Sequence, residues 1–324
     1  MTTTYPVITV TRRLPEPVET VLTQRFDARL NAQDRPLDRA ALVAAMRDSD
    51  ILLPTITDRI DADLIATEGR RVRLIANFGA GVDHIDLAAA AAAGIAVTNT
   101  PDALTDATAE LAILLMLMAA RRAGEGEREL RAGDWTGWRP THLVGRGLTG
   151  AVLGLVGFGR IAQATAARAK GLGMTIRYFS RTAADPATAA ALGAERCETL
   201  AELAAVADVV SLHVPGGDAT RHMVDAAFLS GMRRDAILVN TARGSVVDEA
   251  ALVEALDGGR IGAAALDVYE REPAVHPGLL GHARAVLLPH LGSATIEART
   301  AMGLQAIANI DAFLTGTDLP NRVA

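Results

Sequence analysis

Residues 151–182 read AVLGLVGFGRIAQATAARAKGLGMTIRYFSRT and contain the pattern that decides the fold. An apolar run of strand length, residues 151–156, leads into a glycine turn at residues 157–159. The alanine-rich residues 160–170 predict a helix, and residues 175–179 predict a second strand. Strand, turn, helix and strand form one βαβ unit, so the stretch predicts an α/β protein with a parallel sheet.

The turn between strand and helix has the spacing of a phosphate-binding loop. Gly157 permits a tight turn, and Gly159 lets the backbone approach a pyrophosphate at the helix N-terminus. Ala162 occupies the third glycine position and is small enough for close packing of helix on strand. The alternative is an ordinary tight turn in an α/β domain. The candidate cofactor-binding residues here are Gly157, Phe158, Gly159, Arg160 and Ile161.

The end of the second strand indicates which dinucleotide binds. An NAD site usually carries an acidic residue there, about 20 residues after the glycines, to bind the ribose 2′-hydroxyl. This chain has Ser180, Arg181 and Thr182 instead. A hydroxyl and a guanidinium would bind and neutralise a 2′-phosphate, which an acid would repel. The pattern favours NADP(H), with NAD(H) as the second candidate; the alternative is that Arg181 is an ordinary surface arginine.

Length and composition place the chain among ordinary globular proteins. Its 324 residues suffice for two domains, 50% are hydrophobic and 22% are charged. A net charge of -6 argues against nucleic acid or an anionic membrane as a partner. A lone cysteine, Cys197, excludes an internal disulfide framework. Residues 1–10 lack a signal-peptide pattern. The apolar residues 111–120 are too few to span a bilayer and instead predict a buried helix. We therefore expect a cytoplasmic protein.

Alternating strand and helix patterns predict two α/β domains. The last helical pattern, residues 294–314, is expected to return to the first domain. We therefore expect a discontinuous first domain, residues 1–101 plus 294–324, and an inserted second domain, residues 102–293. Strands are expected in the first domain at residues 7–10, 50–53, 72–76 and 95–98, with helices at residues 18–25, 39–46 and 60–68.

A second glycine pair lies in the first domain, at Gly79 and Gly81. Asp83 and Asp86 follow, and their charges suit a helix N-terminus but compete with a phosphate. The backbone N–H groups of Ala80 and Gly81 are candidates to bind a smaller anion, such as a substrate carboxylate. The alternative is a plain turn followed by acidic helix capping.

Residues 102–122 predict one long helix that crosses between the domains, with Thr105 near its start. Residues 124–150 carry many glycines and both tryptophans, Trp135 and Trp138, without a regular pattern. A long irregular segment in a compact protein is usually functional or part of an interface. The tryptophans therefore predict a subunit contact or, equally, packing on their own domain.

Reactive side chains are expected where parallel strands end, because ligands of open α/β sheets lie there. Six strands are expected in the second domain: the two of the βαβ unit and residues 209–214, 236–241, 263–268 and 285–288. Arg243, Glu272 and His290 follow the last three. A histidine can donate a proton to the carbonyl oxygen of a substrate or accept one from it, and a carboxylate can orient the imidazole ring. An arginine can bind the carboxylate of the substrate. Further candidate cofactor contacts are Val214, Pro215, Thr241, Ala242 and Gly292.

Each of the three side chains also has an ordinary interpretation. His290 fits a capped loop histidine, Glu272 a solvated loop acid, and Arg243 an interdomain salt bridge. His213 ends another strand without an acid or arginine beside it and is interpreted as structural. No cysteine and histidine cluster has metal-ligand spacing, so no metal site is predicted.

Six segments resemble the D-isomer-specific 2-hydroxyacid dehydrogenases, and the resemblance runs over nearly the whole chain. They are NFGAGVDHID (77–86), TPDALTDATAELAILLMLMAARR (100–122), GLVGFGRIA (154–162), NTARGSVVDEAALVEAL (240–256), ALDVYEREP (265–273) and PHLGSAT (289–295). The resemblance is greatest to the glyoxylate/hydroxypyruvate reductase branch, in which an SRT-like strand end goes with NADPH. It implies two Rossmann-like doubly wound domains, a substrate-binding flavodoxin-like one and an NADP-binding one, with the active site in the cleft between them, and a homodimer.

The resemblance also implies residue roles. Arg243 would bind the substrate, Glu272 would pair with the histidine, and His290 would be the general acid/base. The N–H groups of Ala80 and Gly81 would bind the substrate carboxylate. Asp267 would meet the carboxamide of the nicotinamide, and Thr105 would lie near the cofactor.

These inferences lead to one functional hypothesis. The chain would reduce small 2-oxo acids, glyoxylate or hydroxypyruvate, to 2-hydroxy acids with NADPH, and His290 would be the acid. D-lactate, phosphoglycerate or phosphite dehydrogenase activity is the alternative within the family. A dinucleotide-sensing binding protein of the corepressor type is the alternative from another class.

Overall fold

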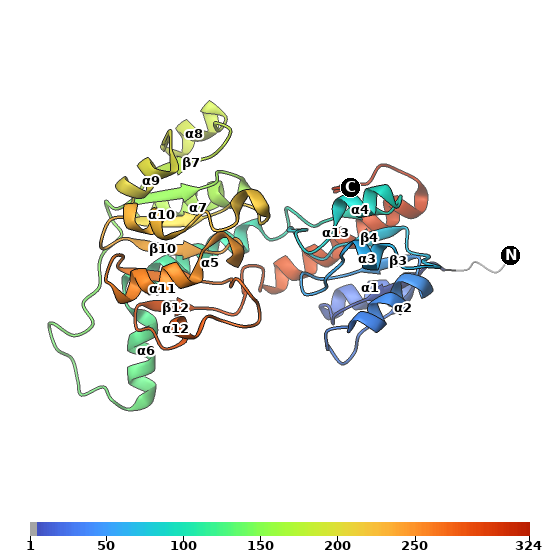
Figure 1. Cartoon of the computed structure of the whole chain (residues 1–324), viewed down its shortest axis with the longest axis horizontal. Helices are drawn as coiled ribbons and strands as arrows, with labels where there is room; N and C mark the ends of the chain where they lie inside the picture. Colours follow the sequence, from blue (N-terminus) through green and yellow to red (C-terminus); the bar gives the residue numbers. More distant parts are fainter. Residues whose placement is uncertain (1–4) are drawn as a thin grey trace. The chain divides into compact units, whose positions relative to one another are not determined.

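The computed structural model describes residues 5–324. Residues 1–4 lie outside the described residues; they belong to residues 1–10, for which no signal peptide is expected. The chain divides into two units. We call the described residues up to Leu104 together with Ser293–Ala324 the N-terminal unit, and Thr105–Gly292 the central unit. Figure 1 shows the helices and strands of both, coloured along the chain.

The N-terminal unit is built on a sheet with the strand order β2-β1-β3-β4-β5, in which all neighbouring strands are parallel. The edge strand β2 was not expected, because its sequence Asp-Ala-Arg contains no apolar run. The other strands lie where the sequence predicts them. Their bounds are β1 (Val7–Val10), β2 (Asp27–Arg29), β3 (Ile51–Leu53), β4 (Leu74–Ala76) and β5 (Ala96–Thr98).

Helices cover both faces of this sheet because alternate strand residues point to opposite sides. Ile51 and Leu53 of β3 pack in one cluster with helices α1 and α13, and Leu52 packs in another with α2, α3 and α4. The chain's last helix thus belongs to the N-terminal unit (Figure 1). The helix expected at residues 60–68 spans only Ala62–Ile65. The helices are α1 (Glu16–Arg25), α2 (Arg39–Asp48), α3 (Ala62–Ile65), α4 (Leu87–Ala92) and α13 (Ile296–Thr315).

The central unit is built on a parallel sheet with the order β12-β11-β10-β9-β6-β7-β8. The strand order reverses between β6 and β9, which is the switch point where open α/β sheets bind ligands. The described residues form seven strands here, so the expectation of six is wrong. The extra strand, β8, has the polar sequence Ala-Glu-Arg at the sheet edge and gives no apolar signal. The strands are β6 (Val152–Val156), β7 (Thr175–Phe179), β8 (Ala194–Arg196), β9 (Val209–Leu212), β10 (Ile237–Asn240), β11 (Ala263–Leu266) and β12 (Ala285–Leu287).

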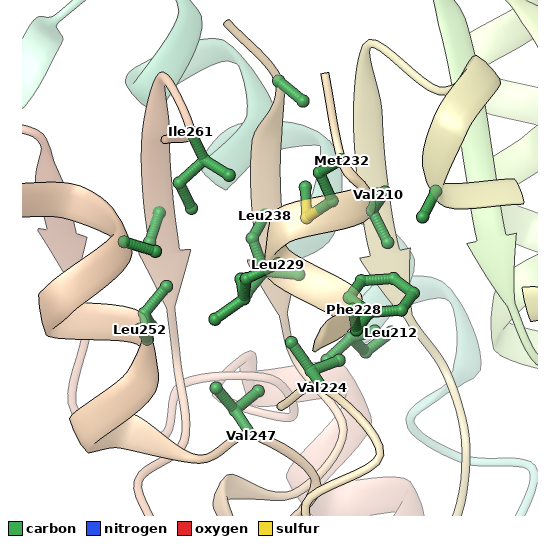
Figure 2. Packing of buried hydrophobic residues seen from close by; sticks show 14 of the residues in the cluster. Val210, Leu212, Val224, Phe228, Leu229, Met232, Leu238, Val247, Leu252 and Ile261 are labelled. Atoms are coloured by element: carbon green, nitrogen blue, oxygen red, sulfur yellow. The ribbon is translucent and has the colours of Figure 1, made fainter. Parts of the chain in front are cut away.

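Two apolar clusters cover the two faces of the central sheet. Figure 2 shows the first, in which strand residues such as Leu212 and Leu238 lie near Phe228 and Leu229 of α10 and Leu252 of α11. On the opposite face, alternate strand residues pack against α5 and α7. The helices are α5 (Thr105–Ala120), α6 (Ala123–Ala132), α7 (Arg160–Gly171), α8 (Pro186–Leu192), α9 (Leu200–Val206), α10 (Ala226–Gly231), α11 (Glu249–Asp257) and α12 (Pro277–Leu280), with short 3-10 helices at Asp218–Thr220 and Gly244–Val246.

Helices α5 and α6 differ from the expectations. Helix α5 starts at Thr105, and its Leu114 and Leu117 are 47% and 38% exposed, so the expected buried helix is buried on one face only. The segment expected to be irregular begins with α6, and ion pairs three and four residues apart support this helix although it buries no residue. Figure 1 shows α6 and the loop after it extending away from the central sheet. Across residues 5–324, no helix combines the length and apolar character needed to cross a membrane.

Candidate active site

The turn after β6 can be built only with glycine at position 157. Gly157 has a φ of 90°, and a Cβ there would lie 2.4 Å from the carbonyl oxygen of His213. Gly159 has a φ of −76°, and a Cβ on it would meet no atom of the described chain within 4 Å. Between them, Phe158 stacks on Tyr178 of β7 with ring centroids 4.1 Å apart. The space in front of Gly159, at the N-terminus of α7, is what a pyrophosphate needs.

Two hydroxyl groups of the central unit fit a bound cofactor. Thr105 Oγ1 and Thr241 Oγ1 are buried and have no hydrogen-bond partner among the described residues. Buried polar groups nearly always have a partner, so these two hydroxyls suit a ligand that supplies one. Both residues are among the expected cofactor contacts, and Val214, another of them, lies against Gly157. The residues present therefore fit a dinucleotide.

The end of β7 is polar and carries no acid. Ser180 Oγ donates a hydrogen bond to the carbonyl oxygen of Thr182 at 2.6 Å, which closes a small turn around Arg181. Arg181 is exposed. Arg196 of β8 lies beside this turn, and its Nη2 donates to the carbonyl oxygen of Ser180 at 3.2 Å. The edge strand β8 therefore brings a second guanidinium to the strand end where the adenosine ribose of a dinucleotide binds.

The ends of β11 and β12 bring Glu272 and His290 together. His290 Nδ1 lies 2.8 Å from Glu272 Oε2. An ionised carboxylate only accepts hydrogen bonds, so Nδ1 carries a proton and Nε2 is left for a substrate. Glu272 Oε1 accepts from the N–H of Tyr269 at 3.0 Å, which holds the second carboxylate oxygen. The side chains of His290 and Glu272 are 29% and 34% exposed, so a ligand can reach the pair.

A buried carboxylate holds the turn that carries His290. Asp267, 1% exposed, accepts from the N–H groups of Leu291 at 2.6 Å and Gly292 at 2.8 Å. His290 has a φ of 55°, which is costly for a residue with a side chain and needs support from its surroundings. Thr108 of α5 adds a bond from Oγ1 to the carbonyl oxygen of Gly292 at 3.0 Å. Asp267 thus fixes the His290 backbone, and its expected contact with the nicotinamide carboxamide stays a prediction.

Arg243 lies in a turn that Asn240 holds. Asn240 Nδ2 donates to the carbonyl oxygen of Arg243 at 2.9 Å, and its Oδ1 accepts from the N–H of Ala242 at 3.0 Å. A Cβ on Gly244 would lie 1.8 Å from the carbonyl carbon of Tyr269, so the turn packs directly on the loop that carries Glu272. Arg243 and Glu272 therefore share one edge of the central sheet.

Burial and charge act in opposite directions on the carboxylates. Partial burial raises the pKa of Glu272, but the hydrogen bond and charge of His290, the N–H of Tyr269 and the charge of Arg243 outweigh it, so the pKa stays below its usual 4.5. Burial raises the pKa of Asp267 despite its two N–H partners. Burial also lowers the pKa of His213 to about 4, so this histidine is neutral at neutral pH. In the part of the chain that is described, no group of three His, Cys, Asp or Glu side chains is arranged to hold a metal ion.

The turn after β4 in the N-terminal unit has the features of an anion site. The carbonyl groups of Gly79, Ala80 and Gly81 all accept hydrogen bonds within this unit. The N–H groups of Ala80 and Gly81 donate to no other group within residues 5–324. Asp86 is used to cap α4, accepting from the N–H of Ala89 at 2.9 Å. Two successive N–H groups without a partner suit a carboxylate.

Known proteins are similar to this chain in sequence over nearly its whole length. The family model for the D-isomer specific 2-hydroxyacid dehydrogenase, NAD binding domain, matches residues 113–292. A glyoxylate reductase of Thermococcus litoralis is 42% identical over 322 residues, which cover 98% of this chain and 96% of that protein. The chain belongs to the D-isomer specific 2-hydroxyacid dehydrogenase family. This confirms the family inferred from the sequence motifs.

Solved structures of dehydrogenases in this family have the same fold. A putative D-isomer specific 2-hydroxyacid dehydrogenase from Polaromonas sp. matches with a TM-score of 0.92 and 38% identity, covering 99% of this chain and 100% of that one. An NADPH-dependent glyoxylate/hydroxypyruvate reductase from Sinorhizobium meliloti, in complex with NADP and malonate, matches with a TM-score of 0.86 and 35% identity, covering 99% and 97%. The expected pair of parallel-sheet α/β domains is confirmed, and the chain is an NAD(P)-dependent oxidoreductase with 2-hydroxyacid dehydrogenase activity.

Three side chains that support the dehydrogenase's candidate site were not identified from the sequence. Asn77 directly follows β4, Asn240 ends β10, and Arg196 ends β8. Asn77 and Asn240 could have been identified from the sequence, because each lies at the end of an expected parallel strand, just before the turn that carries Gly79 or Arg243. Arg196 had no such signal, because β8 has no apolar pattern to mark it as a strand.

The lowered pKa of Glu272 predicts how its replacement changes the dehydrogenase's stability with pH. A carboxylate whose pKa is lower in the folded state stabilises the protein above its unfolded pKa and loses this effect as the pH falls through the folded value. The Tm advantage of the wild type over Glu272→Gln should therefore be about 2–4 °C or less near pH 6 and should shrink between about pH 5 and pH 3. Thermal melts across this pH range measure it. Glu254→Gln, on the exposed face of α11, is the control, and a difference that grows toward acid pH would contradict the assignment.

Proposed function

We propose that this dehydrogenase reduces small 2-oxo acids, glyoxylate or hydroxypyruvate, with NADPH. The observation that supports this proposal most strongly is the hydrogen bond of 2.8 Å between His290 Nδ1 and Glu272 Oε2, at the same sheet edge as Arg243. A 2-oxo acid carries the two groups that these residues suit. Its carbonyl oxygen takes a proton from an imidazole, and its carboxylate binds a guanidinium or backbone N–H groups.

Each residue has a defined part in the proposed reduction. Bound NADPH supplies the hydride that adds to the carbonyl carbon. His290 donates the proton on Nε2 to the carbonyl oxygen, so that the alcohol forms without a separated charge. Glu272, ionised because its pKa is low, stabilises the protonated imidazole and fixes its orientation. Arg243 and the N–H groups of Ala80 and Gly81 bind the carboxylate.

The preference for NADPH rests on the end of β7. Ser180 and Arg181 stand where an NAD-specific unit carries an acid, and Arg196 adds a second guanidinium. The NADPH-dependent relative from Sinorhizobium meliloti is 35% identical over nearly the whole chain, which agrees with this preference.

We also propose that the chain forms a homodimer through α5 and the segment after it. Leu114 and Leu117 expose apolar surface on α5, and Trp135 and Trp138 are 51% and 82% exposed. Large exposed apolar and aromatic side chains are enriched at subunit interfaces. This arrangement favours the subunit contact over packing of the tryptophans on their own unit.

Steady-state oxidation of NADPH and NADH, each with glyoxylate, hydroxypyruvate, pyruvate and one bulkier 2-oxo acid, tests the proposed function. We expect the highest kcat/KM with NADPH and the two small polar acids. A clear preference for pyruvate or for the bulkier acid would place the chain in another branch of the family. Tight dinucleotide binding without turnover would favour a sensing role.

Replacing Arg181 with alanine tests the cofactor preference directly. We expect the KM for NADPH to rise about 10- to 100-fold, because a charge-assisted contact with the 2′-phosphate is lost, and the KM for NADH to stay unchanged. Arg221→Ala, which removes another exposed arginine of the central unit, is the control. Equal changes for both dinucleotides would show that Arg181 does not contact the 2′-phosphate.

A further inference from the structure

Side-chain hydrogen bonds hold all three carbonyl groups of the turn at residues 79–81. Asn77 is fully buried, and its Nδ2 donates to the carbonyl oxygens of Gly79 at 3.1 Å and Gly81 at 2.9 Å. Asn99 Nδ2 donates to the carbonyl oxygen between them, that of Ala80, at 2.7 Å. We infer that Asn77 and Asn99 are positioning residues that aim the N–H groups of this turn at the substrate carboxylate. This inference rests on the proposed function, in which those N–H groups bind the carboxylate.

The geometry of the peptide bond connects the carbonyl groups to the N–H groups. In a planar trans peptide, the C=O of one residue and the N–H of the next point in opposite directions. Holding the Gly79 carbonyl therefore fixes the N–H of Ala80, and holding the Ala80 carbonyl fixes the N–H of Gly81. By the same reasoning, the bond from Asn77 to the Gly81 carbonyl fixes the N–H of Val82.

The orientation of the Asn77 amide follows from its partners. Its Nδ2 faces two carbonyl oxygens, which can only accept, so that atom is the nitrogen. Its Oδ1 lies 3.1 Å from His84 Nε2, so the Nε2 of His84 carries a proton and donates. The amide cannot turn over without placing an oxygen against two carbonyl oxygens.

The two asparagines are not equivalent. The Gly79 carbonyl also accepts from the N–H of Thr100 at 2.9 Å, so loss of Asn77 leaves it one partner. Among the described residues, Asn99 is the only partner of the Ala80 carbonyl. Loss of Asn99 should therefore release the Gly81 N–H, whereas loss of Asn77 should release mainly the Val82 N–H and loosen that of Ala80.

The test uses Asn77→Leu and Asn99→Leu in the full-length protein. Leucine has nearly the shape of asparagine and adds no charge, so the effect reports lost hydrogen bonds. We expect the KM for glyoxylate to rise about 10- to 100-fold in at least one variant, because backbone N–H groups of the turn then lose their hydrogen bonds to the charged carboxylate. The Kd for oxalate, a stable dicarboxylate measured by calorimetry, should rise by a similar factor. The kcat should change less than about threefold, because the carboxylate is bound alike before and during the reaction.

Asn31→Leu is the matched control. Asn31 belongs to the same unit, and its Nδ2 also donates to two backbone carbonyls, those of Thr11 at 2.7 Å and Arg35 at 2.6 Å. It makes no bond to the 79–81 turn. We expect its KM and oxalate Kd to equal those of the wild type, and the Kd for NADPH to be unchanged in all three variants.

The outcomes separate this inference from the proposed function. If the wild type is fully active and both Asn77→Leu and Asn99→Leu keep the wild-type KM and oxalate Kd, the inference about the asparagines is wrong and the proposed function stands. Equal losses of kcat and NADPH binding in these variants would also overturn it, because they would show a general structural role. If Asn77→Leu does not fold, the half-buried Asn99 decides the question. A wild type that binds oxalate but reduces no 2-oxo acid would refute the proposed function, while the oxalate Kd values would still test the turn.

Discussion

Replacing His290 with alanine is expected to lower kcat for glyoxylate by about 100- to 10,000-fold and to leave the Kd for NADPH unchanged within about twofold. The reason is that the proton for the carbonyl oxygen then has to come from water. His290 Nδ1 is bound to Glu272 at 2.8 Å, so the ring is already oriented for this transfer in the folded chain. Stopped-flow or steady-state kinetics with a fluorescence titration of NADPH measure both quantities.

His282→Ala is a matched control for this prediction. His282 lies just before β12, at the opposite end of the strand that His290 follows, and its Nε2 is 3.5 Å from Asp257 Oδ1. It is therefore also a histidine with a carboxylate partner, but away from the strand ends that carry the candidate site. We expect its kcat to be near that of the wild type. Equal losses of turnover and NADPH affinity in His290→Ala would show that His290 is not the proton donor.

Alanine at Gly157 and at Gly159 is expected to have opposite consequences. A Cβ at position 157 would lie 2.4 Å from the His213 carbonyl oxygen, on a residue with a φ of 90°. Strain of this kind costs about 1–3 kcal/mol before the clash is counted, so the Tm of Gly157→Ala should fall by at least several degrees. A Cβ at position 159 meets no protein atom within 4 Å and has an ordinary φ of −76°, so the Tm of Gly159→Ala should stay the same.

The affinity for NADPH is expected to distinguish Gly159→Ala from the wild type. If the pyrophosphate approaches the backbone at Gly159, a methyl group there should raise the Kd for NADPH by about 100-fold or more, because close approach is the reason for glycine at this position. Calorimetry for the Kd and differential scanning fluorimetry for the Tm give the two values. Wild-type NADPH affinity in Gly159→Ala would show that the phosphates bind elsewhere.

The sequence predicted the parts of the candidate site that follow from strand ends. Arg243, Glu272 and His290 were identified because they lie in the loops after three expected parallel strands, whose carboxyl ends lie at one edge of a sheet. The support of these turns by other side chains was not predicted: Asn240 was not identified, and Asp267 was named from the family resemblance for a different role. Asn240 and Asp267 act through bonds to backbone groups of the turns beside them, and such bonds appear only when the turn has its folded shape.

The sequence by itself determined the βαβ unit, the glycine turn and the apolar strands, because each depends on local patterns of a few residues. Only the tertiary structure decided the edge strands β2 and β8, which are polar and exist through pairing with β1 and β7. It also decided why position 157 needs glycine, since the obstructing carbonyl belongs to His213 at the end of a neighbouring strand. Contacts between residues distant in the chain depend on how the strands are ordered in the sheet, and local composition does not encode that order.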